Sequence, residues 1–175
     1  MEAEFDSRLL NHRNECNPDF RRADCFEVEK DLTLLRLGHH RKLEDERKNK
    51  IADAFELIKM VINEQNLNRR TVESVLNANS RYYLIKNKEE IVGCIGFEVS
   101  PGKIDCIFIK PAFRRKGYME KVLKTFTKNS NWLVLATTAK NKPINKLAVK
   151  AGFKATVLDD KLIYQFTKPK ESDVE

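Results

Sequence analysis

The sequence predicts a mixed α/β (α+β) fold, and three observations lead to that class. With 175 residues, 41% of them hydrophobic, the chain is long and apolar enough to bury a real core. Apolar residues recur at helical spacing in some segments and alternate, or run together, at strand spacing in others. The expected order is strand, helices, three strands, helix, strand, helix and hairpin, which is typical of helices packed on a mixed sheet.

The N-terminal part is expected to hold a polar arm followed by a strand. Residues 1–24 show no apolar periodicity and are interpreted as a loose arm or as an extension packed on the domain. Phe26 and Val28 alternate with glutamates, which predicts a short, half-buried strand. The leucines of 32–37 either prolong that strand or begin a helix, and their pattern does not decide between the two.

Two helices and three strands are expected next. Apolar residues at three- and four-residue spacings predict a helix over 41–66, and a shorter helix is expected at 71–78. The chain then becomes rich in β-branched and aromatic residues. Separated by turn-forming residues, these predict strands at 82–85, 91–99 and 104–109.

The C-terminal part alternates helices and strands. A helix is expected over 116–128, with its apolar side formed by Met119, Val122, Leu123 and Phe126. An apolar strand follows at 132–136, and a second helix at 143–151 is expected to end at Gly152, a residue suited to the position after a helix. The segment 153–166 reads as a final hairpin with its turn at two aspartates.

The chain shows no linker and no repeat, so one domain is expected over residues 25–168, between the arm of 1–24 and a frayed tail at 169–175. No apolar run is long enough to cross a bilayer, and the N-terminus lacks the apolar stretch of a signal peptide. The four cysteines and the adjacent His39 and His40 show no metal-ligand spacing. We therefore expect a cytoplasmic protein without a membrane partner or a metal.

Positive charge is concentrated in one segment. The net charge is +7, but Pro101 to Lys154 contains thirteen Lys or Arg against Asp105 and Glu120, a net charge of +11, while the rest carries −4. Such a field suits either an acidic macromolecule, nucleic acid included, or a small polyanion such as a phosphorylated cofactor.

The chemistry is expected where this basic segment joins a strand to a helix. A strand ends at Pro111, and a short loop leads to a helix that opens at Gly117. Helix N-termini present unpaired N–H groups and partial positive charge, so they bind phosphate. Glycine lets the backbone approach the anion closely. The loop adds three full charges, and the segment therefore predicts a diphosphate cradle at Arg114, Arg115 and Lys116.

This junction resembles the Q/R-x-x-G-x-G/A motif of the Gcn5-related N-acetyltransferase (GNAT) superfamily. The motif reads Arg114-x-x-Gly117-x-Met119 here, so that Met119 stands where the family prefers Gly or Ala. The preceding Ile109-x-Pro111 is similar to the end of the family's strand.

Downstream, the family often shows Asn, a helix and then Gly-Phe, and Asn141 with Gly152-Phe153 fits that spacing. Ala148 takes the place at which many members carry a tyrosine that protonates the departing thiolate. The similarity is good over about half of the chain, from Tyr82 to Phe166, and weak before it.

The resemblance implies a mixed, mainly antiparallel central sheet flanked by helices on both sides. It implies an acetyl-coenzyme A-dependent N-acetyltransferase, in which an amine attacks the thioester directly and acetyl-coenzyme A serves as co-substrate. A backbone N–H near the end of the strand would stabilise the oxyanion. The implied cofactor-binding residues are Phe108, Ile109, Arg114, Arg115, Lys116, Gly117, Tyr118, Met119 and Asn141.

Acyl transfer to an amine benefits from a base, because an alkyl amine with a pKa near 10 is only about one part in a thousand neutral at pH 7. Glu98 and Asp105, on adjacent predicted strands, are the candidates, with Glu98 first. Tyr118 or Tyr164 is a candidate proton donor for the thiolate, since the usual tyrosine is absent.

Other functions fit the same residues. One alternative is a catalytically weak or inactive binding or structural protein on this scaffold, for example a phage virion-associated member, because Met119 and Ala148 depart from the motif. Another is a nucleic-acid-directed acyltransferase or modification protein. The acceptor is an amine of open class, namely a protein lysine or N-terminus, a small amine or a nucleic acid. An acidic macromolecular partner and a monomer or homodimer are also expected.

Overall fold

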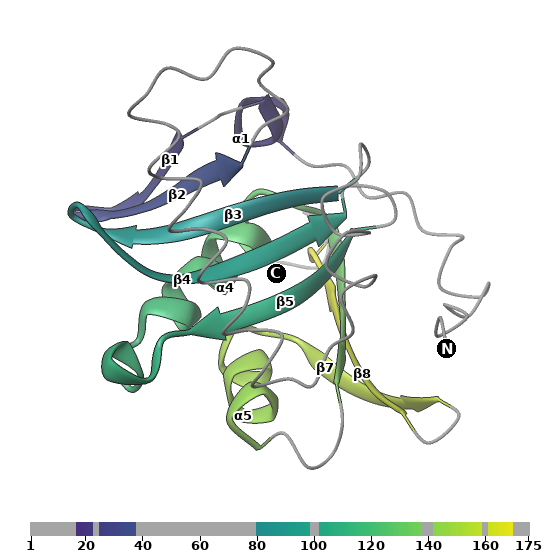
Figure 1. The fold of residues 1–175 in the computed structure, drawn as a ribbon. Helices are drawn as coiled ribbons and strands as arrows, with labels where there is room; N and C mark the ends of the chain where they lie inside the picture. Colours follow the sequence, from purple (N-terminus) through teal and green to yellow (C-terminus); the bar gives the residue numbers. More distant parts are fainter. Residues whose placement is uncertain are drawn as a thin grey trace. The chain divides into compact units, whose positions relative to one another are not determined.

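In the computed structural model the fold is described for residues 17–22, 25–37, 80–98, 102–137, 142–158 and 161–169 (Figure 1). The helices expected over 41–66 and 71–78 lie outside the described residues, as do Asn141 and the turn at 159–160. The chain divides into two compact units. The first unit comprises Arg22–Phe97 and Asp105–Tyr118, and the second comprises Met1–Arg21, Glu98–Ile104 and Met119–Glu175.

The first unit is built on a run of strands. Their order is β1-β2-β3-β4-β5, and β1 pairs antiparallel with β2, which pairs antiparallel with β3. The ends of β4 and β5 also contribute to the second unit. The strand bounds are β1 Cys25–Glu29, β2 Leu32–Leu37, β3 Ser80–Asn87, β4 Glu90–Glu98 and β5 Lys103–Ile109.

The ambiguous leucines of 32–37 form neither a longer first strand nor a helix. They form β2, a separate strand that turns back on β1 through Lys30 and Asp31. Asp31 has a φ of 68°, a left-handed conformation that Asp tolerates better than most residues and that lets the turn be tight. Leu32 and Leu34 are buried on one side of β2, as expected for a strand with one apolar face.

The second unit continues with the strand order β5-β6-β8-β7. β5 and β6 pair in parallel at Lys103 with Val134 and at Ile104 with Leu135, whereas β6 with β8 and β8 with β7 are antiparallel. The sheet is therefore mixed and mainly antiparallel, as predicted. The remaining elements are α1 Pro18–Arg22, α4 Tyr118–Lys128, β6 Trp132–Thr137, α5 Lys142–Lys150, β7 Lys154–Leu158 and β8 Lys161–Thr167.

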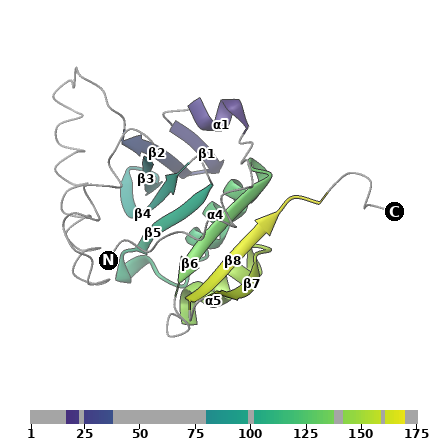
Figure 2. The same ribbon diagram turned by 90° about the vertical axis from the view of Figure 1, so that its right-hand side faces the viewer.

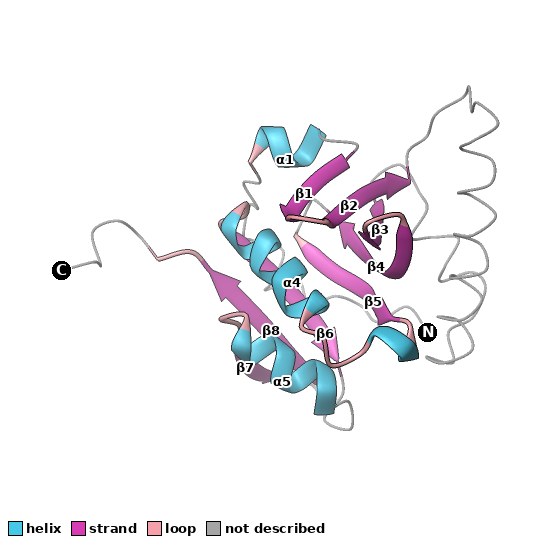
Figure 3. Cartoon of the chain, turned by 90° about the vertical axis from the view of Figure 1, so that its left-hand side faces the viewer, coloured by secondary structure: helices cyan, strands magenta, loops and turns pink. Residues whose placement is uncertain are grey.

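Helices α4 and α5 lie on one face of the β6-β8-β7 sheet (Figures 2 and 3). The apolar stripe predicted for α4 is confirmed, because all four of its members are buried. Phe126 of that stripe meets the ring of Phe20 from α1 edge to face, with the ring centroids 5.1 Å apart. The N-terminal segment thus contributes a buried aromatic residue to the second unit.

The end of α5 shows why the sequence places a glycine there. Gly152 has a φ of 93°, and its N–H donates to the Val149 carbonyl at 3.1 Å. The next N–H, of Phe153, donates to the Ala148 carbonyl at 3.0 Å, and together the two bonds close the helix end. The predicted position of Gly152 after the helix is confirmed.

Within the ranges described above, no helix is both long and apolar enough to span a membrane. The same residues hold no group of three or more His, Cys, Asp or Glu able to bind a metal ion.

Candidate cofactor-binding and active site

The strand β5 ends where the sequence predicts it. Lys110 donates its backbone N–H to the Val92 carbonyl at 2.8 Å, and Pro111–Phe113 then form one turn of 3-10 helix. Proline has no N–H to continue the ladder and suits the start of a helical turn. The chain leaves the sheet at this point and reaches α4 through a loop of four residues.

That loop, Arg114–Gly117, has a strained and open backbone. Arg115 has a φ of 65° and Gly117 a φ of 79°. A left-handed arginine costs roughly 1 kcal/mol or more and is typical of functional sites. All four residues are exposed, and among the described residues no atom lies within 4 Å of a Cβ built at Gly117. The loop backbone before α4 therefore has room for a ligand.

Two cations of the loop, Arg114 and Lys116, contact residues that precede the loop. Arg114 donates from Nε to the Ile109 carbonyl at 2.8 Å, and its guanidinium lies 5.5 Å from the centre of the Phe108 ring. The Lys116 ammonium lies 5.4 Å from the ring centre of Phe113. Such contacts orient cations at modest cost to their solvation. Between Cys106 and Met119 the sequence contains four cations and no acid, so the local field is strongly positive.

Met119, the residue that departs from the family motif, is buried. Its side chain is only 6% exposed and belongs to the buried stripe of α4. The neighbouring Tyr118 is half-buried, and its hydroxyl oxygen accepts a hydrogen bond from the Asn87 side-chain amide at 3.0 Å.

The end of β5 also makes a close backbone contact with β4. A Cβ built at Gly93 would collide with the carbonyl oxygen of Phe108 and would lie 2.8 Å from Cδ1 of Ile109. Only glycine allows the two strands to approach at this point. Gly93 therefore fixes the path of β5 at the two residues expected to supply a backbone donor.

The predicted catalytic residues fall in different parts of the chain. Glu98 is half-buried at the end of β4, and its carbonyl accepts the Gly102 N–H at 2.9 Å. Asp105 lies in β5, and its side chain is outside the described part. Tyr164 is buried in β8, opposite Leu135. Residues 108–118 belong to the first unit, whereas Glu98 and Tyr164 belong to the second.

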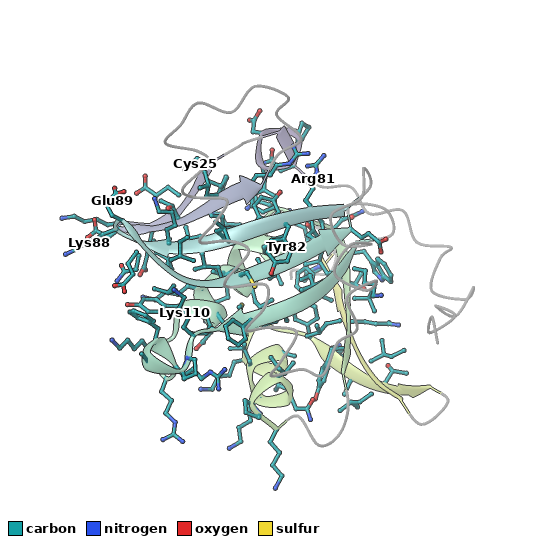
Figure 4. All side chains as sticks on the ribbon, in the orientation of Figure 1. Cys25, Arg81, Tyr82, Lys88, Glu89 and Lys110 are labelled. Carbon is teal, nitrogen blue, oxygen red and sulfur yellow. The ribbon has the colours of Figure 1, made fainter. Side chains whose placement is uncertain are left out.

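Sequence reasoning did not assign a role to a buried polar pair. Tyr82 lies on β3 (Figure 4) and donates its hydroxyl to the Cys94 thiol at 2.7 Å. Both side chains are buried. Burial raises the pKa of the Cys94 thiol from 9.0 to about 12, while the hydrogen bond from Tyr82 acts in the opposite direction. The pairing links two strands whose contact the sequence alone does not reveal.

Comparison with known proteins identifies the class. The sequence matches the acetyltransferase (GNAT) family over residues 42–153, which is more than half of the chain. The protein therefore belongs to the GNAT family, and as a member it is an acyltransferase that uses acetyl-coenzyme A. No curated protein sequence matches the chain.

Solved structures of acetyltransferases share the fold. The microcin C7 self-immunity acetyltransferase MccE, in complex with acetyl-CoA and AMP, has a TM-score of 0.56 and 16% identity, over 81% of this chain and 94% of its own. An acetyltransferase from Salmonella typhimurium that modifies the N-terminal serine of ribosomal protein L7/L12 has a TM-score of 0.57 and 14% identity, over 83% and 99%. N-acetyltransferase PseH from Campylobacter jejuni has a TM-score of 0.55 and 18% identity, over 79% and 99%.

Proposed function

We propose that the protein binds the diphosphate of acetyl-coenzyme A at the loop Arg114–Gly117 and transfers the acetyl group to an amine. The observation that carries the proposal is the exposed cationic loop with two left-handed residues, directly before the N-terminus of α4. Unpaired amides, a helix N-terminus and full positive charges together favour a phosphate group. The parallel pairing of β5 with β6 is at Lys103 and Ile104, near the start of β5. A backbone N–H further along β5, near Phe108 or Ile109, lies beyond this pairing, which supports placing the oxyanion donor there.

The chemical step is a direct displacement. The neutral amine nitrogen bonds to the thioester carbonyl carbon, and the oxyanion that forms accepts a hydrogen bond from the β5 backbone. The intermediate collapses by breaking the carbon–sulfur bond. The amine loses its proton to a base, the role predicted for Glu98, and coenzyme A leaves as a thiolate. A thiol pKa of about 8.5 makes that leaving group adequate near neutral pH without a dedicated acid.

Titration calorimetry tests the cradle. Acetyl-coenzyme A and acetyl-pantetheine, which lacks the diphosphate, are compared on the wild type and on Arg115→Gly. Glycine accepts the φ of 65° and removes the arginine side chain together with its charge. We expect Arg115→Gly to weaken acetyl-coenzyme A binding about tenfold, and Lys121→Ala, on the exposed side of α4, to leave it unchanged. Equal affinity for the two ligands would refute the cradle.

A kinetic test separates the base from the cradle. Glu98→Gln keeps the shape of the side chain but removes its basicity. We expect kcat to fall about 10²-fold or more, as for loss of a general base, while the affinity for acetyl-coenzyme A holds. An equal loss of turnover and of coenzyme affinity would assign Glu98 a structural role instead.

The acceptor is an amine, and its class is settled by measuring free thiol release. The panel contains a peptide with a free N-terminal serine, chosen because the Salmonella typhimurium enzyme modifies such an N-terminus. It also contains a lysine peptide with a blocked N-terminus and a polyamine. Preference for one class appears as a difference in kcat/KM, since discrimination between substrates is a difference in transition-state binding.

A second candidate function is a catalytically inactive binding scaffold. The observation that favours it is Ala148, which is fully buried at the position where many family members carry the proton-donating tyrosine. This role predicts tight acetyl-coenzyme A binding with no thiol release for any amine of the panel. Turnover with any one of them would exclude it.

An acidic protein partner is proposed at the outer side of α5. Lys142, Lys146 and Lys150 are exposed at four-residue spacing with no acid in the helix, and Val149 beside them is 61% exposed. Like charges at this spacing destabilise a helix unless an external anion compensates them. An exposed apolar side chain amid lysines suits a protein segment with carboxylates around an aliphatic residue better than a phosphate backbone.

Fluorescence anisotropy tests this surface with a labelled, glutamate-rich helical peptide that carries a central leucine. The variant reverses all three lysines to glutamate, and the control reverses Lys121 and Lys128 of α4. We expect peptide binding to be lost in the first variant and mostly retained in the control. Unchanged peptide binding contradicts the proposal, and binding of a duplex RNA in place of the peptide would favour the nucleic-acid alternative.

A further inference from the structure

One side-chain hydrogen bond ties the end of β3 to the start of α4. Asn87 donates to Tyr118 at 3.0 Å although the residues are 31 positions apart, and both are half-buried. Tyr118 directly follows the loop Arg114–Gly117. We propose that Asn87 is a positioning residue, which holds Tyr118 and the first turn of α4 in place for acetyl-coenzyme A. The inference rests on the proposed function of that loop.

Asn87 is itself held by a rigid turn. It is the last residue of β3, and the next N–H, of Lys88, donates to the Asp31 carbonyl at 2.7 Å. Across the turn, the Lys86 ammonium lies 3.5 Å from the Glu89 carboxylate. Figure 4 shows Lys88 and Glu89 at the tip of this turn, directed away from the strands. The Glu89 side chain is 95% exposed, so the ion pair adds little, and the backbone hydrogen bond of Lys88 is what holds the strand end that presents the Asn87 amide.

The loop is thereby anchored at both ends and open between them. At its start, Arg114 is bonded to the carbonyl that ends β5. At its far end, Tyr118 is bonded to Asn87. Arg115 and Gly117, between the anchors, are exposed and left-handed. A loop already ordered before binding loses less conformational entropy when the ligand arrives, so Asn87 strengthens binding through Tyr118 without touching the ligand.

The direction of the Asn87–Tyr118 hydrogen bond leaves the Tyr118 hydroxyl able to donate a second one. A phenol hydroxyl can accept one hydrogen bond and donate another. Since Tyr118 accepts from Asn87, its own hydrogen stays available for an oxygen of the ligand. Asn87 would in this way orient the hydroxyl as well as the helix turn.

A double-mutant cycle tests the inference on the full-length protein. The variants are Asn87→Ala, Tyr118→Phe and the combination, with the Kd for acetyl-coenzyme A, KM, kcat and melting temperature measured for each. We expect each single variant to weaken binding about five- to tenfold, the value of one hydrogen bond. The double variant should bind no more weakly than Tyr118→Phe alone, because Tyr118→Phe already removes the hydrogen bond that Asn87→Ala removes. In Asn87→Ala, kcat should change less than about twofold, since Asn87 acts on binding.

Glu89→Ala is the matched control, because it alters the same turn and removes the Lys86 ion pair but leaves Asn87 in place. Loss of affinity in this control equal to that in Asn87→Ala would overturn the inference. Wild-type affinity in Asn87→Ala, or multiplied losses in the double variant, would do the same. If Asn87→Ala does not fold, Asn87→Asp decides, because a carboxylate keeps the shape of the side chain but cannot donate a hydrogen bond: weaker binding at an unchanged melting temperature supports the role, and unchanged binding overturns it. Absence of acetyl-coenzyme A binding in the wild type contradicts the proposed function instead.

Discussion

At the scale of single residues, the buried Cys94 thiol couples stability to alkaline pH. Its pKa is raised to about 12 in the folded protein by burial, against 9.0 for the free group. The stabilisation is therefore fully present below pH 9 and is lost as the pH rises from 9 towards 12, because only the unfolded thiol then ionises. By pH 10 the loss amounts to about 1 kcal/mol.

The measurement is urea unfolding of the wild type and Cys94→Ala at pH 7 and pH 10. We expect the wild type to lose about 1 kcal/mol more than the variant between the two pH values. The comparison cancels the titration of lysines and of the other thiols, which both proteins share. Equal losses would show that the Cys94 thiol ionises as readily in the folded state as in the unfolded one.

The residue at position 148 offers a second prediction. Ala148 is fully buried, whereas its neighbour Val149 is 61% exposed. Ala148→Tyr, which restores the family's residue, has to force a ring into packed core and should destabilise the fold by about 1–3 kcal/mol without raising kcat. Val149→Tyr is the matched control and should be nearly neutral in stability. Thermal unfolding and thiol release measure both effects, and a faster enzyme of unchanged stability would contradict the prediction.

At the scale of elements, the contact between β4 and β5 depends on Gly93. Adding a Cβ there displaces the Phe108 carbonyl, so Gly93→Ala should destabilise the protein by about 1–3 kcal/mol in urea unfolding. It should also lower kcat/KM, because β5 shifts where the oxyanion donor is proposed. Gly117→Ala serves for comparison, since its added Cβ meets no described atom and suffers only from the φ of 79°. Full stability in Gly93→Ala would show that the strands separate freely.

Helices and strands with a regular spacing of apolar residues could be predicted from the sequence. Segments whose structure depends on pairing with a neighbouring strand could not. The stripe of α4 and the stop at Gly152 follow from spacing and from the conformational freedom of glycine. The leucines of 32–37 have no clear period, and they form a strand because β1 and β3 offer backbone partners on both sides. The Asn87–Tyr118 bond was equally hidden, because its residues are 31 positions apart and the motif that contains Tyr118 says nothing of Asn87.

The candidate site divides in the same way. The loop Arg114–Gly117 could be predicted as a candidate phosphate site because the role proposed for it depends on local chemistry, namely cations, a glycine and a helix start. Its left-handed Arg115 was not, since an arginine gives no sign of positive φ in sequence. Tyr164 looked available as a proton donor, yet it is buried in β8 between two paired strands, a property that arises from the C-terminal hairpin.

At the scale of the whole molecule, the charge asymmetry and the fold act together. The basic segment Pro101–Lys154 contains both the cationic loop before α4 and the exposed lysines of α5. The positive charge of this one segment is therefore presented at two separate surfaces. Glu120, the single acid of α4, is paired with Lys124 at 3.0 Å. That pair lowers the pKa of Glu120, by its hydrogen bond first and then by its charge, and Lys150 of α5 adds to the effect.

Ligand binding should therefore stabilise the whole fold in a salt-dependent way. Acetyl-coenzyme A at about a hundred times its Kd stabilises the folded state by about 2.7 kcal/mol. For a chain of this size that raises the melting temperature by about 5–10 °C.

Inorganic pyrophosphate should give a smaller rise in melting temperature and should compete with the coenzyme. Salt at 0.5 M should reduce both shifts by screening. Arg115→Gly should lose the pyrophosphate shift while keeping part of the coenzyme shift, since the pantetheine arm still binds. Thermal unfolding monitored by fluorescence measures these shifts, and a pyrophosphate shift that survives in Arg115→Gly would place the diphosphate elsewhere on the basic surface.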